Sequence, residues 1–238
     1  MSHPERIVPD ETEPGIVALH LKRYDFALRY CRDALVLDAG CGVGYGAAHL
    51  SGVARQVVGV DADEHAIEYA RTRYAGDNVS FEVGDVLDLT FEDGSFDAAC
   101  SFEIVEHVPD PERFVGEIAR VLKPGGVLVL STPRADDPRV RPANPFHERE
   151  FDAKTLRALL APSFRSVELF GQRRLQTVRH RALQRLDVLG LRRRLPLARR
   201  AGHALTGTAA MADVRLEGIA IEHGATDAAS ELIAVCRT

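Results

Sequence analysis

The residues best suited to hold a ligand are three glycines and two aspartates between residues 38 and 61. Gly40, Gly42 and Gly44 follow an apolar run that reaches Asp38, and a second apolar run ends at Asp61. Glycine permits the positive-φ turns and the close approach of backbone N–H groups that nucleotide-binding loops require. A carboxylate at the end of the next strand can accept hydrogen bonds from ribose hydroxyls. The pattern therefore predicts a nucleotide-binding half-fold.

The spacing of these residues has two interpretations. Gly42-x-Gly44-x-x-Ala47, with Asp61 19 residues after Gly42, satisfies the loose dinucleotide fingerprint and would indicate an NAD-dependent oxidoreductase. The spacing of Asp38 and the three glycines instead resembles motif I of the class I S-adenosylmethionine-dependent methyltransferases. The loop alone does not distinguish the two.

Three segments farther along the chain favour the methyltransferase interpretation. Residues 81–86 resemble the end of that family's third strand, and 96–108 resemble its fourth strand with the loop that lines the methyl-transfer site. Residues 122–126 resemble the fifth-strand signature. The resemblance covers roughly residues 34–133 and implies S-adenosyl-L-methionine as the cofactor.

The resemblance also implies roles for individual side chains. Asp85 would accept a hydrogen bond from the adenine amino group, and Val86 would pack near the ring. A helix before the core would lie over the methionine end of the cofactor, where Tyr24 could cover the sulfonium and Arg23 could meet the carboxylate. A plain amphipathic lid helix is the alternative. The expected cofactor-binding residues are Tyr24, Asp38, Gly40, Gly42, Gly44, Asp61, Ala62, Asp85, Val86 and Ser101.

The elements that must position these residues are apolar strands that alternate with helices. Such alternation predicts an α/β fold with a mostly parallel sheet. The resemblance implies a Rossmann-like sheet of seven strands, the last one antiparallel, with ligands beyond the carboxyl ends of the strands. We expect strands at 34–38, 56–60, 79–83, 96–101, 126–131, 164–171 and 230–237, and helices at 15–32, 44–51, 63–74 and 111–122.

The chain length suits a single methyltransferase domain over residues 1–238. The four cysteines lie far apart, so neither a zinc site nor a disulfide framework is expected, and we predict no metal ligands. The expected parts are an N-terminal lid helix (1–33), the cofactor-binding core (34–171), a basic helical insertion before the last strand (172–213) and a final strand region (214–238).

Candidates for removing a proton from the acceptor lie in two segments. His107 is in the loop after the fourth expected strand, where it could instead cap a helix or pack. His147 and Glu150 belong to a block at 144–151 that resembles one in methyltransferases that modify sugars, cell-surface glycans and secondary metabolites. The block could also be a plain helix entry, with Asp152 as N-cap.

The segment 173–200 contains ten arginines against one acid, Asp187, with leucines between them. This basic amphipathic pattern could contact an anionic membrane surface, hold a phosphorylated or lipid-linked substrate, or form a cap paired with the acidic body. Nucleic acid is unlikely as a partner, because the segment has no aromatic residue for stacking.

These features predict an enzyme that transfers a methyl group from S-adenosyl-L-methionine to a small-molecule, sugar or lipid-linked acceptor. The expected acceptor atom is oxygen. We expect it to be cytoplasmic, because no apolar run approaches the roughly 20 residues that span a bilayer. The basic segment would allow a peripheral contact with a membrane. The alternatives are an NAD-dependent oxidoreductase and a non-catalytic cofactor-binding partner protein.

Overall fold

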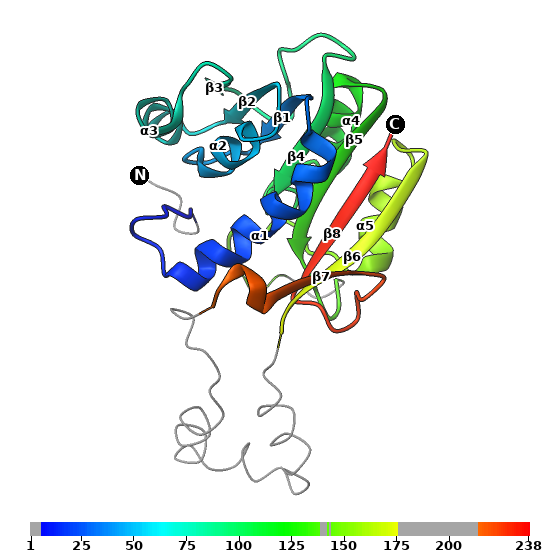
Figure 1. Cartoon of the computed structure of the whole chain (residues 1–238). Helices are drawn as coiled ribbons and strands as arrows, with labels where there is room; N and C mark the ends of the chain where they lie inside the picture. Colours follow the sequence, from blue (N-terminus) through cyan, green and yellow to red (C-terminus); the bar gives the residue numbers. More distant parts are fainter. Residues whose placement is uncertain (1–5, 139–141, 143, 176–213) are drawn as a thin grey trace, which may run out of the picture.

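The computed structural model describes residues 6–138, 142, 144–175 and 214–238, and these form one sheet flanked by helices (Figure 1). Eight strands of the described residues pair in the order β3-β2-β1-β4-β5-β8-β6-β7. The strands are β1 (Leu35–Ala39), β2 (Gln56–Asp61), β3 (Val79–Val83), β4 (Phe96–Phe102), β5 (Leu122–Pro133), β6 (Ser166–Arg174), β7 (Ile219–His223) and β8 (Glu231–Arg237). Strands β1 to β5 are parallel, whereas β8 is antiparallel to both β5 and β6.

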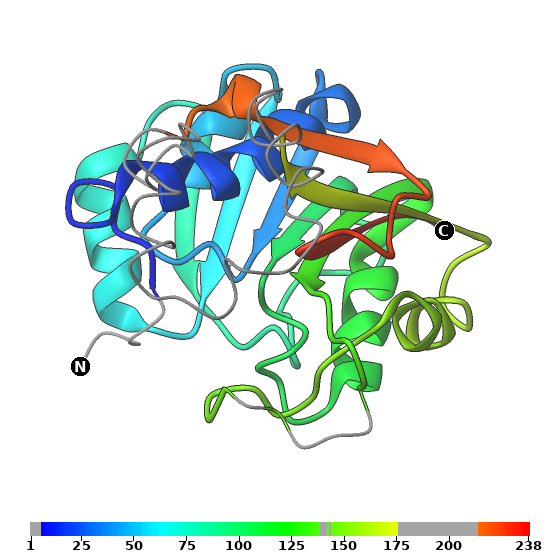
Figure 2. The same cartoon turned by 90° about the horizontal axis from the view of Figure 1, so that it is seen from below.

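Helices cover both faces of the sheet, and each face has its own apolar core. The helices are α1 (Pro14–Cys31), α2 (Tyr45–Ser51), α3 (Glu64–Tyr74), α4 (Pro111–Val121) and α5 (Ala153–Leu160), with a short 3-10 helix at Leu216–Gly218. Buried residues of α1, α2 and α3 pack on one face, and those of α4 and α5 pack on the other. Figure 2 shows α1 and α4 on opposite sides of the strands.

Local sequence signals explain where the helices begin. Asp63 accepts hydrogen bonds from two backbone N–H groups of the first turn of α3, and Asp110 does the same for one N–H of α4. Asp152 and Thr155 form a reciprocal capping box at the start of α5. Asp152 is therefore the helix cap that the sequence suggested.

The parallel strands bring their carboxyl ends to one edge of the sheet, where the site is expected. Strand β1 is almost wholly buried between the helical layers, and the inner residues of β5 and β8 are buried as well. Because both faces are covered, these strands are near-continuous apolar runs rather than alternating ones. The residues that follow β1, β2, β3 and β4 are thus held by a rigid core.

The fold class is as predicted, with two corrections in the second half. The sheet has eight strands and not seven, because Ile219–His223 forms the additional edge strand β7. Residues 172–174, assigned to the basic insertion, belong to β6 and pair with β7. The rest of the expected helical insertion, 176–213, lies outside the described residues. Among those described, no helix is long and apolar enough to cross a membrane.

Candidate active site

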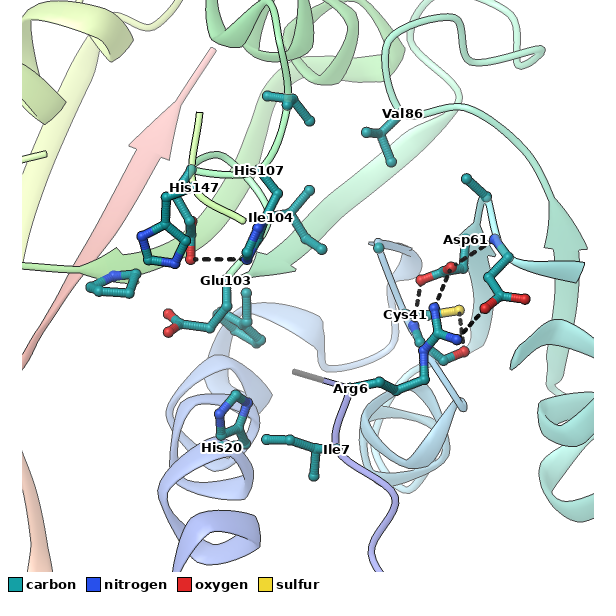
Figure 3. Close-up of a pocket in the computed structure, with 18 of the residues that line it drawn as sticks. Arg6, Ile7, His20, Cys41, Asp61, Val86, Glu103, Ile104, His107 and His147 are labelled. Atoms are coloured by element: carbon teal, nitrogen blue, oxygen red, sulfur yellow. Dashed lines mark hydrogen bonds and ion pairs between the residues drawn. The ribbon is translucent and has the colours of Figure 1, made fainter. Parts of the chain in front are cut away.

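A cleft of about 1000 Å³ lies beyond the carboxyl ends of β1, β2 and β4, beside the first helix. Most of the predicted site residues line it. These are Tyr24, Gly40, Gly42, Asp61, Ala62, Asp85, Val86, His107 and His147. The close-up in Figure 3 shows two ends: Asp61 and Cys41 lie on one side, and Glu103, His107 and His147 on the other. The cleft is large enough for a nucleoside-sized ligand and a second reactant.

The glycine turn after β1 forms part of the floor of the first end. Gly40, Gly42 and Gly44 all have positive φ, at 80°, 54° and 85°. A Cβ at Gly40 would lie 2.3 Å from Ile104 Cδ1, and one at Gly44 would lie 2.7 Å from Ala70 Cβ, whereas a Cβ at Gly42 would meet no atom within 4 Å. Gly42 therefore faces the open cleft, while the other two are required by packing as well as by φ.

Asp61 joins this turn to the segment after β2 through its two carboxylate oxygens. Oδ2 accepts the Gly42 N–H at 2.8 Å, and Oδ1 accepts the Asp63 N–H at 3.0 Å. Arg6, from the segment before α1, lies with Nη2 3.5 Å from Asp61 Oδ1 and also pairs with Asp63. A ribose that reached Asp61 would share this carboxylate with Arg6 or displace it.

Tyr24 joins α1 to the glycine turn. Its hydroxyl donates to Asp38, with 3.3 and 3.2 Å to Oδ1 and Oδ2, and its ring packs edge-on against Phe102. The ring also occupies the space above Gly46, where a Cβ would lie 1.9 Å from Tyr24 Cζ. Burial raises the pKa of Asp38 to about 7, against the opposing effect of the Tyr24 hydrogen bond.

Four of the predicted residues do not line the cleft. Asp38 and Ser101 are buried behind it, and Ser101 Oγ donates to the Ala39 carbonyl at 2.7 Å. Gly44 begins α2 beneath the turn. Glu150 stands behind His147, with Oε1 3.1 Å from Nδ1. Any role of these four in binding would act through the residues that they hold.

Arg23 does not line the cleft, where it was expected. Its side chain is 2% exposed, with Nη1 3.2 Å from Glu103 Oε1 and Nη2 3.7 Å from Glu231 Oε1. Its Nε donates to Gln172 Oε1 at 3.3 Å. Arg23 therefore links α1 to β8 and β6, and it is not among the cleft residues that could meet a cofactor carboxylate.

The other end of the cleft joins two loops. His107 lies between β4 and α4, and His147 lies between β5 and α5; their rings meet edge to face with centroids 4.9 Å apart. His107 Nδ1 lies 2.9 Å from the Phe146 carbonyl oxygen. The two histidines named from separate segments of the sequence thus share one site.

The sequence analysis assigned no role to two glutamates in the loop after β4. Glu103 has a left-handed φ of 60° and lines the cleft, and its Oε1 accepts from Ser131 Oγ at 2.7 Å. Glu106 is 1% exposed, and its Oε2 accepts from Thr132 Oγ1 at 3.0 Å. Burial, and then the charge of Glu103, raises the pKa of Glu106 well above its usual value. The spacing Glu103-x-x-Glu106-His107 was the available signal, but a loop glutamate gives no sign that it will be buried.

Together the fold and the cleft define a nucleotide-binding α/β domain of the Rossmann-like class. Comparisons with known proteins specify the family. Residues 37–130 match the family model of the methyltransferase domain. A probable S-adenosylmethionine-dependent methyltransferase of Mycolicibacterium smegmatis is 39% identical over 168 residues, which are 69% of this chain and 65% of that protein. One of Mycobacterium tuberculosis is 41% identical over 160 residues, 66% of this chain and 58% of that protein.

More distant similarities concern one further sequence and the fold. An O-methyltransferase of Penicillium expansum is 37% identical over 108 residues, covering 43% of this chain and 39% of that protein. Among solved structures, a Thermotoga maritima methyltransferase, named as a possible histamine N-methyltransferase, superposes with a TM-score of 0.65 at 18% identity, over 96% of this chain and 95% of its own. The matches to the two mycobacterial proteins span 65% and 58% of their lengths.

Residues 37–130 therefore form a methyltransferase domain, and the similarity of the chain to S-adenosylmethionine-dependent methyltransferases supports S-adenosyl-L-methionine as the cofactor. This confirms the class and the cofactor that the sequence indicated, and it disfavours the NAD-dependent alternative. The roles of individual site residues stay predictions.

Proposed function

We propose that the protein transfers the methyl group of S-adenosyl-L-methionine to a hydroxyl oxygen of a small-molecule, sugar or lipid-linked acceptor. The observation that carries this proposal is the division of one cleft into an end with Asp61 and the glycine turn, and an opposite end with His107 and His147. The first end suits a nucleoside. The second provides groups that can manage the proton of an incoming hydroxyl.

At the cofactor end, each side chain has a distinct task in the proposal. Asp61 accepts from the ribose hydroxyls, Asp85 accepts from the adenine amino group, and Val86 packs on the ring. Asp85 and Val86 lie in the cleft next to Leu87, whose N–H already donates to Asp85 Oδ1 at 2.8 Å. Tyr24 then bounds the region between the nucleoside and the histidine end.

The transfer itself asks for alignment more than for covalent catalysis by the protein. The acceptor O–H bond breaks and releases a proton, while the oxygen forms the new O–CH₃ bond. The electron pair of the broken C–S bond returns to sulfur, and the cofactor leaves as the neutral thioether S-adenosylhomocysteine. The protein contributes by holding oxygen and methyl in line and by assisting loss of the proton.

The acceptor class is proposed on separate grounds from the reaction. The oxygen preference follows the imidazole pair and the similarity to an O-methyltransferase. For the basic segment 173–200 we propose contact with the anionic part of a phosphorylated or lipid-linked acceptor at a membrane surface. Its first residue, Arg173, pairs instead with Glu222 on β7 at 2.8 Å, as a cap on the acidic body would.

The test is a methyl-release assay of the purified protein with S-adenosyl-L-methionine and a panel of hydroxylated acceptors, sugars and lipid-linked sugars included. Formation of S-adenosylhomocysteine that depends on one acceptor class would support the proposal. Tight binding of the cofactor by calorimetry, with no turnover on any acceptor, would favour the non-catalytic alternative.

A further inference from the structure

Three side chains at the histidine end are placed as metal ligands. Glu106, His107 and His147 each have one possible ligand atom that lies within 4.8 Å of those of the other two. Glu106 Oε1 and His107 Nε2 are 4.0 Å apart. Two imidazoles and one carboxylate with open positions are a recurrent set of ligands for divalent first-row metals.

The buried carboxylate provides an independent reason to expect a cation. Glu106 Oε1 has no hydrogen-bond partner among the described residues, although its Oε2 is held by Thr132. A buried acceptor without a partner is destabilising, and most such groups in proteins are satisfied by a donor, a water or an ion. The unpartnered oxygen is the one nearer to His107.

Both imidazoles also have the support that metal-bound histidines usually have. His107 Nδ1 lies 2.9 Å from the Phe146 carbonyl oxygen, and His147 Nδ1 lies 3.1 Å from Glu150 Oε1. Each acceptor favours the tautomer with the proton on Nδ1, which leaves the lone pair on Nε2. This arrangement fixes the orientation of the ring and raises its basicity as a ligand.

The backbone ties the two contributing loops together. The Glu148 N–H donates to the Glu106 carbonyl at 2.8 Å, and the Arg149 N–H reaches the same oxygen at 3.3 Å. The ligands from 106–107 and from 147 are therefore held near one another before any ion arrives. Such preorganisation lowers the cost of binding.

We propose that Glu106 Oε1, His107 Nε2 and His147 Nε2 bind a divalent transition-metal ion at the acceptor end of the cleft. Neighbouring ligands of a metal with bonds of about 2.0–2.2 Å are about 3–3.5 Å apart, so the three groups must close by about 1 Å. The Asn144 amide nitrogen, now 2.9 Å from His147 Nε2, must give up that contact. Imidazole ligands favour Zn²⁺ or Co²⁺ over Mg²⁺.

A metal at this position deepens the proposed function, and its catalytic part rests on that function. Three protein ligands leave coordination positions open to an acceptor hydroxyl, whose pKa falls when its oxygen binds a divalent cation. The hydroxyl proton then passes to water in the open cleft, and the histidines serve as ligands instead of bases. The prediction of no metal ligands from the sequence is replaced here by this proposal.

The binding test uses Co²⁺ and Zn²⁺ with full-length protein that has been treated with a chelator and dialysed. Calorimetry of the wild type should show a site that Glu106→Gln and His107→Ala each weaken at least tenfold. His223→Ala, which removes an exposed histidine on β7, is the matched control and should bind as the wild type does. Co²⁺ absorption in the visible range should disappear in the same two variants.

Several readouts keep the test decisive. Thermal melts and cofactor titrations identify a variant that has failed to fold. Glu150→Gln keeps all three proposed ligands and removes the carboxylate behind His147, so it should lower metal affinity about 10- to 100-fold. Metal affinity that is equal in wild type, Glu106→Gln and His107→Ala would overturn the site. Turnover that survives full chelation would overturn its catalytic role while leaving the proposed methyl transfer intact. Metal binding without turnover on any acceptor would leave the site standing and contradict the proposed function.

Discussion

The hydroxyl of Tyr24 lies within 3.3 Å of both carboxylate oxygens of Asp38, and this contact joins α1 to β1 beneath the glycine turn. Both residues are buried, so the acidity of Asp38 affects the stability of the whole cofactor end. The pKa of Asp38 is raised to about 7, because burial penalises the carboxylate more than the hydrogen bond from Tyr24 favours it.

Asp38→Asn should therefore change how stability depends on pH. An unfolded aspartate releases its proton near pH 4, whereas the folded one keeps it to about pH 7, so between these values the folded state binds more protons. Wild-type stability then falls as pH rises through this window and levels off above it. The asparagine variant lacks this contribution. The difference in unfolding free energy, variant minus wild type, should therefore rise with pH inside this window by up to about 1.4 kcal/mol per pH unit.

Urea denaturation of both proteins from about pH 4.5 to pH 8.5 measures this difference. Tyr24→Phe is an informative companion, because losing the hydrogen bond should raise the pKa of folded Asp38 and so extend the window at its upper limit. Parallel stability curves for wild type and Asp38→Asn would contradict the assignment.

Asp61→Asn should weaken S-adenosyl-L-methionine binding by more than tenfold. Both oxygens of Asp61 accept backbone N–H groups, so an amide would place a donor against Gly42 or Asp63 and would also remove the charge offered to the ribose. Loss of a charged hydrogen bond costs about 1.5–3 kcal/mol. Asp63→Asn removes a charge two residues away and keeps a side chain that can cap α3, so its affinity for the cofactor should change little. Equal affinities of wild type and Asp61→Asn for S-adenosyl-L-methionine in calorimetry would refute the role of Asp61.

Gly42→Ala and Gly125→Ala form a matched pair for separating binding from backbone strain. Both glycines have positive φ, 54° and 81°, and at both an added Cβ would meet no atom within 4 Å. Each substitution should lower the unfolding free energy by about 1–2 kcal/mol. Only Gly42 lines the cleft, so only Gly42→Ala should lose the rise in melting temperature that the cofactor produces. A retained rise in Gly42→Ala would count against the predicted approach of cofactor to this turn.

His147→Ala should lower turnover far more than it lowers cofactor affinity, because His147 lies at the end of the cleft opposite Asp61. The expected loss is about 10²- to 10⁴-fold whether the imidazole acts as a base or as a ligand. Steady-state kinetics together with cofactor calorimetry provide the measurement. A lower melting temperature with unchanged turnover would show that His147 serves only the structure of the loop.

Changing Arg192, Arg193 and Arg194 to Ser tests the proposed contact of the basic segment. Each basic residue near an anionic surface is worth about 1 kcal/mol, so the triple variant should bind anionic vesicles much less than the wild type does. Added salt should weaken binding of the wild type as well. Co-sedimentation with neutral vesicles is the control, and equal partitioning of wild type onto both vesicle types would remove the membrane version of the proposal.

The sequence predicted the parallel half of the sheet well. Its buried strands are apolar throughout, and capping residues mark where helices between them begin. The expected strand at 79–83 matches β3, and the expected helix at 63–74 differs from α3 by one residue. Strand β7 lies at the sheet edge and pairs with β6, and it was missed because one of its five residues is buried, which leaves little of the apolar pattern that identifies a strand. Arg173 and Arg174 looked like part of a basic segment, although they belong to the strand that pairs with β7.

The candidate site was predictable where backbone geometry defines it and less so where packing defines it. Glycine spacing and the carboxylate at the end of β2 led to Gly42 and Asp61, and both line the cleft. Burial of Ser101 and of Glu106 depends on contacts between segments far apart in the sequence, and no local pattern reports it. The proximity of His107 to His147 likewise depends on how the loop after β5 folds back onto the loop after β4.

The position of β8 has a consequence for the order of folding. This strand follows β6 and β7 in the chain but lies between β5 and β6 in the sheet. The antiparallel pair β6–β7 joins the parallel half of the sheet only through β8, which pairs with both β5 and β6, and such long-range pairing is slow. Until then Arg23 lacks Glu231 and Gln172, two of the partners that let its charge stay buried. The last step of assembly therefore completes the support of α1, and a chain arrested before it would expose two unpaired strand edges to aggregation.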